Sequence, residues 1–200
     1  MIIHIGLPRT GTTFLQKEIF AKTNCDNFLS DENLFGDITN TIDTFFSQME
    51  GIRNLYDDVR IILVLRDKEK WLKSIYTQYV KEGGYLKYDE WYKRFDKDFI
   101  DWELLLDYLK TFNTVITMNY EDMLKDKKRF VKEFCQFAQI NEPTWEDKKH
   151  NISWDERIVE ANRILNAVFF WYPKTLRFWY PDQFPPRFII TRMVKLIEGE

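Results

Sequence analysis

The stretch "IHIGLPRTGTTFLQ", residues 3–16, contains the pattern that decides the fold. A short apolar run leads into a turn that carries Gly6 and Gly11, and an apolar segment follows it. A phosphate-binding loop requires this order of strand, glycine turn and helix, because loop N–H groups and the positive end of the helix hold an anion. The stretch therefore predicts a strand over residues 1–6, a phosphate cradle, and a helix from Thr12 to about Ala21.

The cradle lacks the lysine of the usual phosphate-loop pattern, Gly-x-x-x-x-Gly-Lys-Ser/Thr. In that pattern the lysine reaches the outer phosphates and the hydroxyl holds Mg²⁺. Here the glycine spacing is kept, but Thr12 replaces the lysine and Thr13 follows it. Arg9 places a permanent cation on the loop, and the threonine hydroxyls are expected to add donors. A sulfuryl group carried on a nucleotide phosphate fits this loop better than a triphosphate, because it bears one negative charge and needs no metal.

The composition is that of a globular chain. The 200 residues are 44% hydrophobic, 30% charged and 17% aromatic, which predicts one domain over residues 1–200, with residues 155–200 as its helical, aromatic-rich extension. The net charge of −3 argues against a nucleic-acid binder. We find no secretory signal and no apolar run long enough to span a membrane, and Cys25 and Cys135 lack metal-site spacing. We therefore expect a cytoplasmic protein with reduced thiols.

Apolar runs alternate with segments of helical periodicity along the chain. The run "VRIILVLRD", residues 59–67, is continuously apolar, which is typical of a parallel strand covered on both faces. The alternation predicts a three-layer α/β sandwich with a mainly parallel sheet, of the P-loop NTPase-like type. The further predicted strands are 27–30 and 113–122, the latter with an acidic turn, and the further predicted helices are 68–81, one or two within 88–112, 126–138 and 155–172.

Four segments resemble sequence elements of the sulfotransferases that use 3′-phosphoadenosine 5′-phosphosulfate (PAPS). "PRTGTTFL", residues 8–15, resembles the loop for the 5′-phosphosulfate, commonly Pro-Lys-Ser/Thr-Gly-Thr-Thr-x-Leu. "LRDKEKWLKSIYTQYVKEGG", residues 65–84, resembles the 3′-phosphate element, in which Arg66 at a strand end and Ser74 on the next helix can converge on one phosphate. "MNYEDML", residues 118–124, and "KHNISW", residues 149–154, resemble later family blocks, so the likeness covers about three-quarters of the chain.

Three departures indicate the branch of the family. Arg9 stands where lysine is usual, which keeps the charge but changes the hydrogen-bond geometry. Lys68 replaces the proline that usually follows the Arg-Asp pair, and the Arg-Lys-Gly element of the cytosolic small-molecule branch is missing. The chain looks more like the bacterial and carbohydrate-acting sulfotransferases.

The resemblance implies transfer of a sulfuryl group from PAPS to a hydroxyl or amine of an acceptor, a carbohydrate or glycolipid, without a metal. Arg9 would stabilise charge on the bridging oxygen as the sulfur–oxygen bond breaks. Glu32 is the expected general base and its neighbour Asp31 the alternative, whereas His4 in the first strand is expected to be a core residue. The residues assigned to the nucleotide are Arg9, Thr10, Gly11, Thr12, Thr13, Phe14, Arg66, Ser74, Lys149, Asn151 and Ser153.

Two other functions fit the cradle. A P-loop kinase would need Asp67 to organise Mg²⁺ without the lysine, and a nucleotide-sensing module would keep the cradle without a working base. Lys149, Asn151 and Ser153 could instead form a charged surface loop. The aromatic and cationic C-terminal segment could rest on a membrane surface, although packing against the domain is the default. The sequence leaves the acceptor and the oligomeric state open.

Overall fold

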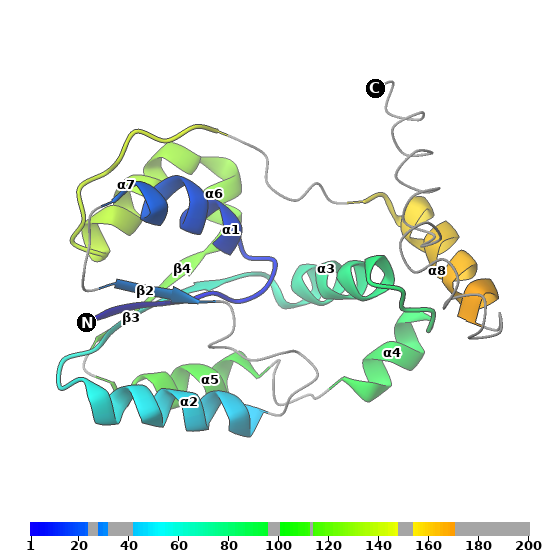
Figure 1. The fold of residues 1–200 in the computed structure, drawn as a ribbon, viewed down its shortest axis with the longest axis horizontal. Coiled ribbons are helices and arrows are strands. Elements are labelled where there is room, and N and C mark those ends of the chain that lie inside the picture. Colours follow the sequence, from blue (N-terminus) through cyan, green and yellow to red (C-terminus); the bar gives the residue numbers. More distant parts are fainter. Residues whose placement is uncertain (24–27, 32–41, 96–100, 113, 148–153, 171–200) are drawn as a thin grey trace, which may run out of the picture. The chain divides into compact units, whose positions relative to one another are not determined.

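The computed structural model describes residues 1–23, 28–31, 42–95, 101–112, 114–147 and 154–170. The chain divides into two compact units (Figure 1). The first unit consists of Met1–Trp71 and Phe95–Asn151, and the second of Leu72–Arg94 and Ile152–Glu200.

A parallel sheet forms the centre of the first unit. Its strands are β1 (Ile2–Ile5), β2 (Phe28–Asp31), β3 (Arg60–Leu65) and β4 (Thr114–Asn119). They lie in the order β2-β1-β3-β4, and every neighbouring pair is parallel. In a parallel sheet all strands end at the same edge, so the segments that follow β1, β2, β3 and β4 all leave the sheet there. The predicted parallel sheet is confirmed.

Helices cover both faces of this sheet, which gives the three-layer α/β sandwich predicted from the sequence (Figure 1). One side carries α1 (Thr12–Phe14), α6 (Tyr120–Lys125) and α7 (Lys127–Phe137), and the other carries α2 (Ile42–Leu55) and α5 (Trp102–Leu109). Because strand side chains alternate between faces, Ile62 and Val64 pack toward α7 while Ile61 and Leu63 face the opposite layer. All four are at most 1% exposed, which explains the unbroken apolar run.

The helix after the glycine turn is irregular along its length. α1 continues into the π-helical turn η1 (Leu15–Ile19) and the 3₁₀ turn η2 (Phe20–Lys22). The Thr23 hydroxyl donates to the carbonyls of Ile19 and Phe20, which ends the helix there. The predicted extent, Thr12 to about Ala21, is confirmed within one residue.

Two helices of the first unit differ from the sequence-based expectation. No element was predicted over α2, whose apolar residues Phe45, Met49 and Ile52 recur at helical spacing and are buried. Residues 120–122 were assigned to the end of a strand and an acidic turn, whereas they form the first turn of α6. Glu121 and Asp122 suit that position, because carboxylates are favourable at a helix N-terminus.

The second unit contains most of α3 (Lys68–Lys81), together with α4 (Tyr88–Arg94) and α8 (Glu156–Phe170). α3 spans the predicted residues and ends at Lys81, shortly before Gly83 and Gly84, where Gly83 has a φ of 103°. Asn166 donates to the carbonyls of Val80 and Gly84, both at 2.8 Å, and Asn162 also donates to Val80. These two side chains therefore link α8 to the last turn of α3 and to the glycine turn that follows it.

The aromatic stretch 88–112 forms two helices, α4 and α5, and the side chain of Asp101 caps α5 by accepting from the N–H groups of Glu103 and Leu104. Among the described residues, no helix combines the length and the apolar character that crossing a bilayer requires.

His4 is a core residue, as the sequence predicts. Its ring is fully buried against Phe20 and Phe134, and Nδ1 lies 2.8 Å from the Ser30 hydroxyl of the neighbouring strand. Nε2 has no hydrogen-bond partner among the described residues. Burial disfavours the charged ring and lowers the pKa of His4 from 6.5 to about 3.

This burial predicts that mild acid destabilises the protein. The folded state keeps His4 neutral while the unfolded chain protonates it below pH 6.5, so the stability that His4 provides is present above pH 6.5 and is lost as the pH falls toward 3. We expect the free energy of unfolding in urea to fall by about 2 kcal/mol between pH 7 and pH 5. The His4→Gln variant should lose most of this slope and His150→Gln should keep it; equal slopes in wild type and His4→Gln would contradict the prediction.

Candidate active site

The site is built on the loop that connects β1 to α1, at the carboxyl edge of the sheet. Two of its residues have left-handed backbone conformations, Arg9 with a φ of 66° and Gly11 with a φ of 84°. Arg9 is one of two non-glycine residues with positive φ among those described, and such a conformation costs roughly 1–2 kcal/mol for a residue with a Cβ. Interactions around the loop must therefore hold it in place.

Three consecutive carbonyl groups of the loop accept hydrogen bonds from side chains. The Thr10 and Thr12 hydroxyls donate to the Leu7 carbonyl at 2.7 and 3.0 Å. The Trp71 indole N–H donates to the Pro8 carbonyl at 2.8 Å, and the Arg66 Nη1 donates to the Arg9 carbonyl at 3.1 Å. All three carbonyl oxygens are thus engaged by groups that belong to the protein itself.

The hydroxyls of Thr10 and Thr12 form hydrogen bonds within the loop. Thr10 and Thr12 are at most 1% exposed, and each uses its single hydroxyl proton on the Leu7 carbonyl. In this geometry the two hydroxyls fix the loop, whereas the sequence-based expectation was that they donate to an anion. Any contact of these residues with a phosphate would then come from their backbone N–H groups.

Arg66 lies directly beneath the loop, at the end of β3. Its guanidinium carbon is 4.9 Å from the centre of the Tyr120 ring, in a cation–π contact. The Nη1 atom holds the Arg9 carbonyl, but Nε is buried and has no hydrogen-bond partner among the described residues. A buried charged donor without a partner is costly, so the position fits an anion that would complete its hydrogen bonds.

The neighbouring Asp67 starts helix α3. Its carboxylate Oδ1 accepts from the Lys70 N–H at 3.0 Å, and its own N–H donates to both carboxylate oxygens of Glu121 at 3.3 Å. A carboxylate that caps a helix in this way is already used structurally. The structure therefore does not support the role that a kinase would need from Asp67, which is to organise Mg²⁺.

Trp71 and Tyr120 were assigned by sequence to the core and to the rim of the sheet, and both also contact the site. Trp71 is fully buried, with its ring 5.1 Å from Trp102 and 6.1 Å from Phe95. Helical spacing explained its burial, but no sequence signal indicated that its N–H reaches Pro8 across 63 residues. Tyr120 follows β4 directly, at the same edge as Arg66, which is the one signal that could have placed it here.

The remaining predicted site residues are placed as follows. Phe14 is 4% exposed, and its ring lies edge-to-face with Trp145 at 5.6 Å. Ser74 is 9% exposed on the part of α3 that belongs to the second unit. The backbone of Asp31 pairs with Ile5, so β2 ends at the edge where the loop begins. The residues outside the described ranges are Glu32, Lys149, Asn151 and Ser153.

These features define an α/β protein of the P-loop NTPase-like fold, with a lysine-free glycine loop after β1. The family model of the sulfotransferase domain matches residues 1–157, and the chain belongs to the sulfotransferase family. Its fold is similar to that of a solved sulfotransferase from Alicyclobacillus acidocaldarius, with a TM-score of 0.52, 14% identity, and coverage of 88% of this chain and 98% of that chain. No curated protein matches the chain.

The loop geometry predicts that Gly11 cannot be replaced without loss of stability. A Cβ at Gly11 would lie 2.5 Å from the Met123 Cε, and the φ of 84° disfavours any side chain. We expect Gly11→Ala to lower the free energy of unfolding by about 2 kcal/mol. Gly51→Ala in α2, where a Cβ would meet nothing within 4 Å, should instead raise it by roughly 0.5–1 kcal/mol. Urea unfolding of both variants tests this, and a Gly11→Ala protein as stable as wild type would contradict it.

Proposed function

We propose that this sulfotransferase-family protein transfers a sulfuryl group from PAPS to a hydroxyl or amine of an acceptor, with a carbohydrate or glycolipid as the acceptor class. The observation that carries the proposal is the placement of Arg66, which holds the Arg9 carbonyl with Nη1 while its buried Nε has no partner among the described residues. An oxyanion of the nucleotide is the kind of group that would satisfy that donor.

The two ends of the nucleotide would be held by different elements. The residues from Arg9 to Phe14 would bind the 5′-phosphosulfate through their N–H groups, since the carbonyls of Leu7, Pro8 and Arg9 at the start of the loop are already engaged. Arg66 and Ser74 would bind the 3′-phosphate, and Lys149, Asn151 and Ser153 would complete the nucleotide contacts. These assignments follow the family motifs.

The donor supplies a sulfuryl group joined to the nucleotide through one phosphate oxygen. Arg9 would stabilise the negative charge that develops on that oxygen, as a preorganised cation on a loop of fixed shape. Glu32 would accept the proton of the acceptor hydroxyl, with Asp31 as the alternative base. β2, whose last residue is Asp31, ends at the same edge of the sheet as β1, where the loop begins. No residue of this scheme requires a metal.

Nucleotide binding separates this proposal from a kinase. We expect adenosine 3′,5′-bisphosphate in EDTA, at about one hundred times its dissociation constant, to raise the Tm by about 5–10 °C, because binding at that ratio stabilises a protein by about 2.7 kcal/mol. ATP with Mg²⁺ should raise it less. Arg66→Ala should weaken the binding of the bisphosphate far more than that of adenosine 5′-phosphate. An equal loss for both nucleotides would mean that Arg66 acts only through the Arg9 carbonyl.

Catalysis should depend on the Arg9 side chain more than binding does. We expect Arg9→Ala to lower the transfer of labelled sulfate from PAPS to a panel of carbohydrate acceptors by about 10²–10³-fold, the usual cost of losing one transition-state donor. The affinity for adenosine 3′,5′-bisphosphate should change much less, and Arg9→Lys should restore a large part of the rate. Full activity in Arg9→Ala would remove this residue from the mechanism.

A further inference from the structure

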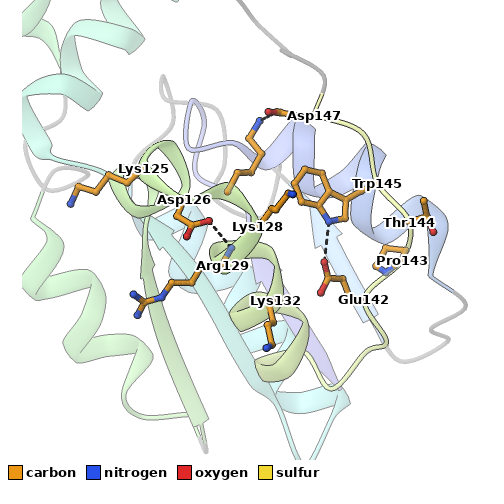
Figure 2. A pocket seen from close by; sticks show the side chains of 11 residues that line it. Lys125, Asp126, Lys128, Arg129, Lys132, Glu142, Pro143, Thr144, Trp145 and Asp147 are labelled. Atoms are coloured by element: carbon orange, nitrogen blue, oxygen red, sulfur yellow. Dashed lines mark hydrogen bonds and ion pairs between the residues drawn. The ribbon is translucent and has the colours of Figure 1, made fainter.

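A cation-rich pocket lies at α7, and Figure 2 shows the side chains that line it. It is an open pocket of about 780 Å³ between the first turns of α7 and the segment that follows this helix. Eleven residues line it: Lys125, Asp126, Lys127, Lys128, Arg129, Lys132, Glu142, Pro143, Thr144, Trp145 and Asp147.

The lining concentrates positive charge in a chain that is acidic overall. It has five cationic side chains and three carboxylates, an excess of two positive charges, whereas the whole chain carries −3. Lys127 pairs with Asp147, and the guanidinium of Arg129 pairs with Glu133 at 2.7 Å. These pairs leave part of the positive charge of the pocket without a carboxylate.

Lys128 and Lys132 carry that unpaired charge. Both are exposed on α7, four residues apart, and neither has an ion pair among the described residues. Like charges at this spacing repel each other and destabilise a helix. A bound anion that lies between the two ammonium groups would remove this repulsion, so the pair favours an anionic ligand.

The other wall of the pocket suits a sugar. Trp145 is partly exposed, and its indole N–H donates to the Glu142 carboxylate at 3.1 Å (Figure 2). The combination of an aromatic ring with a fixed carboxylate and the neighbouring Thr144 hydroxyl offers a surface for C–H groups beside acceptors for hydroxyl groups. A carboxylate among the cations is unfavourable for a ligand that presents only phosphates, such as a nucleic-acid backbone.

The pocket is also connected to the phosphate loop through Phe14. The ammonium group of Lys127 lies 4.7 Å from the centre of the Phe14 ring, and Trp145 packs edge-to-face on the same ring. Phe14 belongs to α1, which begins directly after the loop. A ligand in the pocket would therefore contact residues that pack on the helix that follows the loop.

We propose that this pocket binds an anionic saccharide, one that carries sulfate or carboxylate groups, with Lys128 and Lys132 as its charge contacts and Trp145 as its sugar contact. Binding itself is inferred from the pocket alone. The further step, that the saccharide is part of the acceptor, rests on the proposed function.

Direct binding without any donor nucleotide tests the proposal. Short dextran sulfate fragments and neutral dextran fragments of the same length are titrated into the full chain by calorimetry at 50 and 200 mM salt. We expect the sulfated fragments to bind with an affinity that falls with salt, and the neutral ones to bind at least tenfold more weakly. The double variant Lys128→Ala/Lys132→Ala should bind the sulfated fragments about tenfold more weakly than wild type.

A matched control variant distinguishes binding at this pocket from nonspecific electrostatic attraction to the protein surface. Lys87→Ala/Lys93→Ala removes the same charge from two exposed lysines of the second unit and should leave binding unchanged. Trp145→Ala should weaken binding of the sulfated fragments severalfold, with folding checked by the Tm. An equal loss in the control variant would overturn the proposal, and so would tighter binding of a DNA oligonucleotide or of anionic phosphatidylglycerol vesicles. The response to adenosine 3′,5′-bisphosphate is measured separately, so failure here and failure of the proposed function are distinguishable.

Discussion

The site depends on one constraint: the carbonyl groups of Leu7, Pro8 and Arg9 all accept hydrogen bonds from side chains. A loop with two left-handed residues has alternative shapes of lower backbone energy, so it needs such interactions to stay in one conformation. The same bonds neutralise three negative ends of peptide dipoles next to the position where an anion is proposed to bind. Rigidity and electrostatic preparation therefore arise from the same contacts.

The donors of these bonds come from three different parts of the first unit. Thr10 and Thr12 lie in the loop itself, Arg66 directly follows β3, and Trp71 lies in the first turn of α3. The parallel order of β1 and β3 brings the end of β3 next to the start of the loop, since Ile5 pairs with Leu63. Tyr120, which follows β4, contacts the guanidinium of Arg66 with its ring. The sheet topology thus determines the shape of the loop as well as its position.

Membership in the sulfotransferase family connects this geometry to a reaction. An enzyme that transfers a sulfuryl group needs to stabilise less negative charge than one that transfers a phosphoryl group from ATP. This agrees with a loop that carries Arg9 but has Thr12 in place of the lysine. The helix-capping role of Asp67 agrees with this interpretation. The cationic pocket on α7 is proposed to bind a second anionic ligand, and its residues Lys127 and Trp145 contact the Phe14 ring of α1.

The sequence by itself determined the class of the fold and the position of the glycine loop between β1 and α1. Continuous apolar strands, the glycine spacing at Gly6 and Gly11, and helix signals such as the Gly83-Gly84 stop are local patterns, and local patterns follow from backbone preferences and from burial on two faces. The sequence did not predict α2, because polar residues and Gly51 interrupt the helical spacing of its apolar residues. Its packing against the sheet shows that it is a helix with a buried face.

Only the tertiary structure decided what the site residues do. The hydroxyls of Thr10 and Thr12 turn inward to Leu7, Trp71 reaches Pro8, and Arg66 reaches Arg9. The contacts of Trp71 and Arg66 join residues more than fifty positions apart. Such contacts depend on the order of the strands in the sheet and on which side-chain donor lies nearest to which carbonyl. Residue types and their spacing along the sequence reveal neither of these. A motif can therefore name the residues of a phosphate loop, while the fold assigns each side chain to the ligand or to the loop itself.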